Sequence, residues 1–158
     1  MSKPTTVAEK IGQNRPFRST GQEAVIALWR TSDVLRRFAA AVVEPHGITL
    51  QQYNVLRILR GSEPDGLPTL SIAGRMIERA PGITRMIDRL ETKGLVMRER
   101  RSADRRCVHC RVTPRGLSLL ERLDTAVDTA DAEAMRGLAD DEQRQLIRLL
   151  DAVRAGHS

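Results

Sequence analysis

The chain has 158 residues, a formal net charge of +6 at pH 7, and a composition that is 41% hydrophobic but only 3% aromatic. This length suits one domain, and so few aromatic residues favour an aliphatic core between packed helices. The absence of a signal-peptide segment and of any long apolar run, together with a cysteine count of two, argues against a secreted or membrane protein and predicts a soluble, cytoplasmic one.

The positive charge is concentrated in the middle of the chain. Residues 49–112 contain 13 of the 26 Lys and Arg residues but only 7 of the 20 Asp and Glu residues, so the remainder of the chain is neutral. A basic segment on a neutral scaffold is typical of proteins that bind phosphate backbones, although exposed arginines also serve solubility alone. We therefore expect double-stranded DNA as a partner.

The first long helix is predicted over residues 20–44. Residues 1–19 precede it as a polar, flexible N-terminal arm, in which residues 7–12 are the best candidate for one helical turn. Thr20 is the predicted N-cap, apolar residues then recur at a three-four spacing, and Pro45-His46-Gly47 ends the helix.

Two shorter helices follow. The first covers residues 49–60 and begins with Thr49 as N-cap and Gln52 as its capping-box partner. A loop over residues 61–68 separates it from the second helix, residues 70–77, which Thr69 is predicted to cap.

A third helix is predicted over residues 81–93, with Pro81 in its first turn and Gly94 as its terminator. Its spacing places polar residues on one side and a buried set on the other: Ile83, Met86, Ile87 and Leu90. With the preceding helix it forms a helix-turn-helix, in which this element enters the major groove and arginines bond guanine edges. The predicted DNA contacts on this recognition helix are Pro81, Gly82, Thr84, Arg85, Asp88 and Arg89.

Residues 95–100 and 106–112 alternate in character like the two strands of a hairpin, or wing, with an arginine-rich tip. Such a ribbon reaches the minor groove, where negative potential attracts arginine. We expect Asp104 to orient an arginine rather than to touch phosphate, the alternative being that it only initiates the turn. The predicted DNA contacts of the wing are Arg98, Arg100, Arg101, Ser102, Asp104, Arg105 and Arg106.

The run Cys107-Val108-His109-Cys110 invites a metal or redox interpretation. Side chains alternate along a strand, so the two cysteines point to opposite sides and do not chelate one ion. No metal and no other cofactor is therefore predicted. Redox sensing stays open as an alternative, because the arginines around Cys107 favour its reactive thiolate. Scattered histidines and the lack of a nucleophile or phosphate-loop motif predict that the protein is not an enzyme.

Two C-terminal helices are predicted, one from Pro114 to about residue 137 and one capped by Asp140 or Asp141. Their apolar stripes, like that of residues 20–44, suit a partner helix. The stripes either pack on each other within one chain or form a homodimer, and the homodimer is favoured because paired modules read two half-sites. The predicted division is a helical dimerisation region at residues 20–48 and 113–158 around a DNA-binding domain at residues 49–112.

The sequence resembles the MarR family of bacterial transcription regulators over most of its length. The resemblance rests on LQQYNVL at residues 50–56, ITRMIDRLETKGLV at 83–96, DRR at 104–106 and TPRG at 113–116. It implies a mainly α fold: a winged helix-turn-helix with a two-stranded β wing and a helical dimerisation region. By analogy, Trp29 and His46 border an effector pocket. The chain departs from the family pattern at Ile77-Glu78, where a turn glycine is usual, and at Gly82, where Ser or Thr is common.

The resemblance implies a dimeric, sequence-specific repressor of neighbouring genes that binds pseudo-palindromic operators and is released by a small-molecule effector. One alternative is a non-specific, architectural DNA-binding protein. Another is a regulator that responds to cysteine oxidation. A third is a helical module whose basic charge binds an acidic protein.

Overall fold

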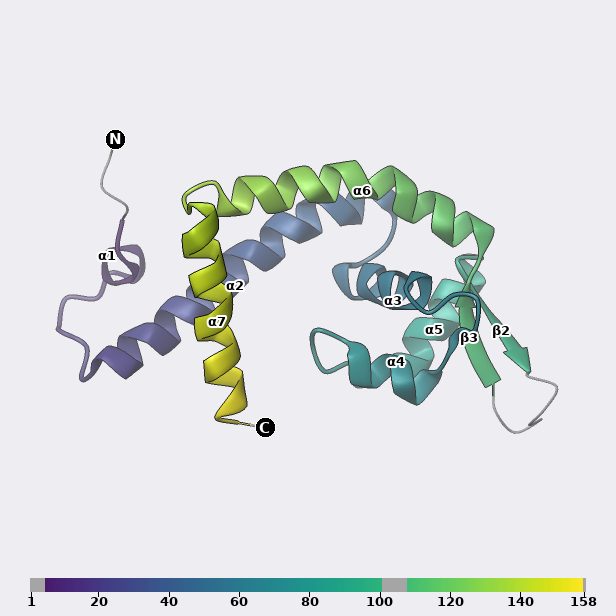
Figure 1. The fold of residues 1–158 in the computed structure, drawn as a ribbon, viewed down its shortest axis with the longest axis horizontal. Coiled ribbons are helices and arrows are strands. Elements are labelled where there is room, and N and C mark those ends of the chain that lie inside the picture. Colours follow the sequence, from purple (N-terminus) through teal and green to yellow (C-terminus); the bar gives the residue numbers. More distant parts are fainter. Residues whose placement is uncertain (1–4, 101–107, 158) are drawn as a thin grey trace. The chain divides into compact units, whose positions relative to one another are not determined.

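A computed structural model describes residues 5–100 and 108–157 of the chain. The chain divides into two compact units, residues 1–38 and residues 39–158. The first unit contains α1 (Val7–Ile11) and most of α2 (Thr20–Val43). The second unit is mainly helical with one small sheet, as the sequence predicts (Figure 1). Its elements, in chain order, are η1 (Glu44–His46), α3 (Leu50–Arg60), β1 (Leu67–Pro68), α4 (Thr69–Arg75), α5 (Ile83–Thr92), β2 (Val96–Arg100), β3 (Val108–Val112), α6 (Pro114–Met135) and α7 (Asp140–Ala155).

The N-terminal arm, predicted to be flexible, contains a helical turn, α1, within the residues that were its best candidate for one. Its start is a capping box, because the Glu9 N–H donates to Thr6 Oγ1 at 3.3 Å and the Thr6 N–H donates to the Glu9 carboxylate at 2.7 Å. The predicted cap of α2 is wrong by one position. Thr20 is already helical, and the Gln22 N–H donates to Ser19 Oγ at 3.1 Å. Gly47, with φ of 80°, ends this region as expected.

The start of α3 agrees with the sequence. The Gln52 N–H donates to Thr49 Oγ1 at 3.2 Å, and the Thr49 N–H donates back to Gln52 Oε1 at 3.1 Å. Gln52 is buried whereas Thr49 is exposed, so this capping box lies at the edge of the fold. Tyr53, Leu56 and Leu59 face the core as predicted, and α3 packs against α6 and β3.

The helix-turn-helix turn differs from the prediction. Pro68 precedes α4, so Thr69 is not its cap; the Thr69 hydroxyl lies 3.7 Å from Cys110 Sγ instead. The helix ends at Arg75, two residues before the predicted end. The Ile77 N–H donates to Asn54 Oδ1 at 3.0 Å, so a side chain of α3 holds the turn that lacks the usual glycine.

The sheet has one strand more than predicted. Its strands are antiparallel in the order β1-β3-β2, with Leu67 opposite Cys110. The loop before β1 lies against β3, because Arg111 donates to the Glu63 carboxylate at 2.6 Å. At Gly66, with φ of 64°, a Cβ would lie 2.5 Å from the Cys110 carbonyl oxygen, so only glycine fits this approach.

The C-terminal helices are placed as expected, with one correction. Thr113 caps α6, and Leu120 and Leu123 of α6 are fully buried. Ala139 precedes α7, whose start is held by the Glu142 carboxylate accepting the Ala139 N–H at 2.7 Å, so neither Asp140 nor Asp141 is the cap.

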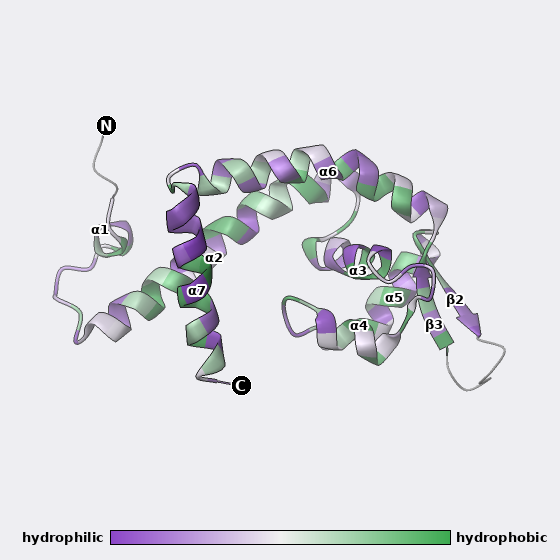
Figure 2. Ribbon diagram, in the orientation of Figure 1, coloured by the Kyte–Doolittle hydropathy of each residue, from purple (hydrophilic) through white to green (hydrophobic). Residues whose placement is uncertain are grey.

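The hydrophobic core lies in the second unit, between the helices α3 to α6 and the sheet. By contrast, no residue of α7 is buried, and hydrophobic residues recur along its surface and that of α2 (Figure 2). Among the described residues, no helix has both the length and the apolar character needed to cross a membrane.

The TPRG sequence provides a test of this packing. A Cβ on Gly116 would lie 2.7 Å from Val112 Cγ2 and would also collide with the Leu95 carbonyl oxygen. We predict that Gly116→Ala lowers the free energy of unfolding by about 1–3 kcal/mol, measured by urea denaturation. Gly74→Ala is the control, since no atom outside the backbone of its own helix lies within 4 Å of its added methyl group. Equal unfolding midpoints for the two variants would contradict the close approach.

Candidate nucleic-acid interface

Helix α5 has one buried side and one exposed side, as its spacing predicts. Ile83, Ile87 and Leu90 are buried, and α5 packs against α4 and β2. The residues on the opposite side are all exposed: Thr84, Arg85, Asp88, Arg89 and Thr92. Hydrogen-bonding side chains thus project together from one rigid element.

The start of α5 corrects one prediction. The helix begins at Ile83, and Pro81 and Gly82 form a turn before it, so Pro81 does not lie in the first helical turn. Gly82 is the N-cap with φ of 88°, a conformation in which a residue with a side chain is strained. This explains why glycine stands where the family pattern favours Ser or Thr. Pro81 and Gly82 are both exposed at the N-terminal end of α5.

The wing strand β2 lies beside α5 and connects to it through Arg98. Arg98 Nη2 lies 2.6 Å from Asp88 Oδ1, and Arg98 Nη1 contacts the Glu91 carboxylate. Burial works to lower the pKa of the Arg98 guanidinium, but the hydrogen bonds that it donates to these two carboxylates outweigh the effect of burial and raise the pKa. The structure therefore brings Arg98 and Asp88, which the sequence predicts as separate DNA contacts, together as a pair.

Arg100 is exposed at the end of β2. The other predicted wing residues, Arg101, Ser102, Asp104, Arg105 and Arg106, lie outside the described residues, as does Cys107.

The described part of the Cys/His run has structural contacts. Cys110 is a free and fully buried cysteine, and His109 Nδ1 lies 3.0 Å from the Asp65 carbonyl oxygen. Within residues 5–100 and 108–157, no group of three or more His, Cys, Asp or Glu side chains is placed to hold a metal ion.

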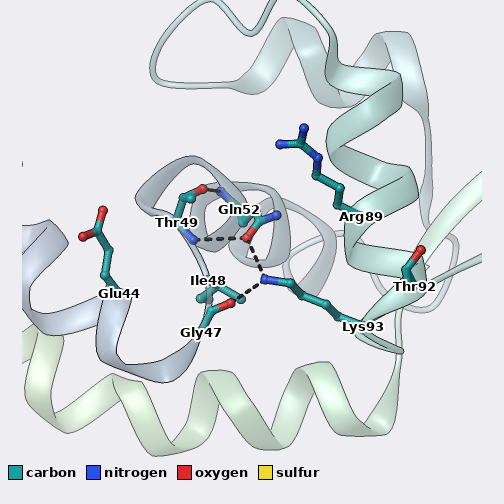
Figure 3. Close-up of a pocket in the computed structure, with 8 residues that line it drawn as sticks. All are labelled: Glu44, Gly47, Ile48, Thr49, Gln52, Arg89, Thr92 and Lys93. Atoms are coloured by element: carbon teal, nitrogen blue, oxygen red, sulfur yellow. Dashed lines mark hydrogen bonds between the residues drawn. The ribbon is translucent and has the colours of Figure 1, made fainter.

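A cavity of about 530 Å³ lies between the start of α3 and the end of α5, within the second unit (Figure 3). Lys93 reaches across it, donating to the Gly47 carbonyl oxygen and, at 3.5 Å, to Gln52 Oε1. The cavity thereby adjoins both the recognition helix and the Thr49–Gln52 capping box. Its lining residues are Glu44, Gly47, Ile48, Thr49, Gln52, Arg89, Thr92 and Lys93.

The predicted effector-pocket residues do not line this cavity. His46 is exposed between the lining residues Glu44 and Gly47, and Trp29, on α2 in the first unit, is 72% exposed. The sequence signals that could have located the cavity are the Thr49–Gln52 capping box and the Lys93-Gly94 helix terminus. Nothing local predicts that these two signals meet.

Comparisons with known proteins identify the family. A profile described as MarR family matches residues 48–108. An HTH-type transcriptional repressor of Mycobacterium tuberculosis is 30% identical over 126 residues, which cover 80% of this chain and 89% of the repressor. The crystal structure of a MarR transcription factor from Planctomyces limnophilus is 42% identical, covers 87% of this chain and 99% of that one, and superposes with a TM-score of 0.65. The chain belongs to the MarR family.

A further structural relative of this MarR-family chain is a mutant form of MarR from Escherichia coli complexed with operator DNA. It is 26% identical, covers 80% of this chain and 90% of that chain, and has a TM-score of 0.73. The profile match of this MarR-family protein spans the elements from α3 to β2. The helix-turn-helix described above is therefore the matched region of a family of transcription regulators.

Arg85 provides the most direct test of the interface, since it is exposed in the first turn of α5. We predict that Arg85→Ala weakens binding to the preferred duplex by about 1–3 kcal/mol and relaxes sequence preference at one position in each half-site. Arg122→Ala is a matched control that removes an exposed arginine from α6. Fluorescence anisotropy with single-base variants of the duplex measures both effects. Unchanged affinity and preference for Arg85→Ala would show that a different surface reads the DNA.

Proposed function

We propose that the protein is a dimeric, sequence-specific DNA-binding repressor, acting in the cytoplasm and without catalytic activity, whose operator binding is relieved by a small molecule. The observation that carries this proposal is the exposed side of α5. Arg85 and Arg89 project from a helix whose opposite side is fixed in the core. A helix of this kind fits the major groove, where arginine bonds two atoms of one guanine.

Recognition of a specific DNA sequence is supported by the arrangement of α5 and β2. Recognition-helix residues are well suited to base edges, whereas Arg100 at the end of β2 is suited to the backbone or the minor groove beside it. The relative from E. coli is complexed with operator DNA. A non-specific architectural protein, the main alternative, would bind operator and scrambled duplex equally in competition.

Dimer formation is supported by apolar side chains that one chain leaves exposed. On α2 these are Val25, Trp29, Val34 and Phe38, with exposed fractions between 41% and 72%, and on α7 they are Ile147, Leu149 and Val153, between 51% and 58%. A second copy of the chain would bury such stripes and place two recognition helices on one duplex. Two-fold symmetry in the protein then favours a pseudo-palindromic operator.

Relief by a small molecule is supported by the cavity at the end of α5. Its lining combines the charged Glu44, Arg89 and Lys93 with the apolar Ile48, and two lining residues flank His46. A ligand that separated Lys93 from Gly47 would shift the recognition helix relative to α3. A structural neighbour, CouR from Rhodococcus jostii, is bound to p-coumaroyl-CoA. The redox alternative receives no support from Cys110, because this thiol is buried.

The experiment that tests the proposal combines hydrodynamics and footprinting. We expect a dimer by analytical ultracentrifugation at micromolar concentration. We also expect DNase I protection of the gene's own upstream region as two half-sites about one helical turn, roughly 10 base pairs, apart. A monomer would contradict the dimer, and equal binding to upstream and scrambled DNA would contradict sequence recognition.

A further inference from the structure

Arg98 bridges two carboxylates on the recognition helix. Asp88 and Glu91 lie three residues apart on α5, and the Arg98 guanidinium gives a separate nitrogen to each, at 2.6 Å from Asp88 Oδ1 and in contact with Glu91 Oε2. The Arg98 side chain is 25% exposed, whereas those of Asp88 and Glu91 are 55% and 42% exposed. The arginine is therefore the most enclosed member of this triad, which is Asp88, Glu91 and Arg98.

The triad changes the charge that α5 presents to DNA. Without Arg98, the arginines Arg85 and Arg89 would share the helix with two carboxylates, which repel phosphate. Arg98 offsets one of these two negative charges and holds both carboxylates in a planar, two-pronged arrangement that a lysine ammonium does not reproduce. A guanidinium held in this way is a poor candidate for a phosphate contact, since leaving the triad would strip two acids of their partner.

The triad also lies at the root of the wing. Arg98 is opposite Cys110 in the pairing of β2 with β3, and Cys110 is fully buried. This pair of residues is therefore the point at which the wing packs into the core. Arg100, two residues further along β2, is exposed. The ion pairs thus connect α5 to β2 just before the exposed end of the strand.

We propose that Arg98 is a positioning residue that fixes the direction of the wing relative to the recognition helix and offsets part of the negative charge of Asp88 and Glu91. This role replaces the sequence-based expectation that Arg98 and Asp88 contact DNA. It rests on the proposed function, because its effect on binding matters only if α5 and the wing read one duplex together. Losing the bridge lets the wing and the helix engage DNA independently, which lowers discrimination between duplexes more than it lowers overall affinity.

The test uses the full-length variants Arg98→Gln, Arg98→Lys and the triple variant Asp88→Asn/Glu91→Gln/Arg98→Gln. Arg100→Gln serves as a contrast, because it removes an exposed arginine from the same strand. The probes are a duplex enriched from a random library by the wild-type protein and a scrambled duplex of equal composition. Three quantities are measured: the ratio of the two affinities, the slope of log affinity against log salt, and amide hydrogen exchange of residues 96–100 without DNA.

Both single Arg98 variants are expected to lower the affinity ratio by about fivefold, because interaction energies between neighbouring surface charges are of this size. Both are expected to retain the wild-type salt slope. Arg100→Gln is expected to do the reverse, flattening the slope by roughly 2 per dimer with little change in the ratio. Exchange at residues 96–100 should be faster in both Arg98 variants than in Arg100→Gln. The triple variant has no unpaired carboxylate, so it should retain its fold and still show the low ratio.

Two results would overturn the proposal. One is a flattened salt slope for Arg98→Gln with wild-type behaviour for Arg98→Lys, which would make Arg98 a phosphate contact. The other is unchanged exchange at residues 96–100 in both Arg98 variants. If the wild-type protein enriched no duplex, the proposed function would fail, and the exchange measurement would still decide whether Arg98 positions the wing.

Discussion

Burial of one side of α5 is the interaction on which the candidate interface depends. Ile87 and Leu90 have no exposed surface, and Ile83 has 7%. Fully burying aliphatic side chains of this size is worth about 1.5–3 kcal/mol each, far more than any exposed ion pair on the same helix. The apolar side therefore fixes the rotation of α5 about its axis, and this rotation determines that Arg85 and Arg89 face outward.

The contacts around α5 extend that constraint to the rest of the second unit. Asn54 of α3 holds the turn before α5, Lys93 connects its end to Gly47, and Arg98 connects its acidic residues to β2. Farther away, Arg60 of α3 forms hydrogen bonds of 2.9 to 3.1 Å with Asp124 of α6. Hydrogen bonding to Asp124 raises the pKa of Arg60, and this ion pair connects the helix-turn-helix to α6.

Sequence reasoning predicted the features that depend on local spacing. The three-four pattern indicated the inner and outer sides of α5, and the Thr49–Gln52 pair indicated the start of α3. It missed features that depend on distant partners. The strand β1 has only two residues, too few for an alternating pattern, and it forms because its loop packs on β3. Pro81 suits a first helical turn locally, but the left-handed Gly82 postpones the helix by two residues.

The site shows the same division. Exposure of Arg85 and Arg89 followed from periodicity, whereas the pairing of Arg98 with Asp88 requires a strand and a helix to pack side by side. A sequence indicates that an arginine is charged and exposed. Whether that arginine is available to DNA depends on the side chain with which it pairs in the fold. The cavity is also a tertiary feature, since Gly47 and Lys93 are 46 residues apart.

The central claim is that α5 reads bases in the major groove while the wing lies along the minor groove. Methylation interference with dimethyl sulfate tests it directly, because the reagent modifies guanine N7 in the major groove and adenine N3 in the minor groove. We predict that methylation of a guanine N7 within each half-site blocks binding, and that adenine N3 methylation interferes only at the outer flanks. Binding that is insensitive to guanine N7 methylation throughout the protected region would contradict this claim.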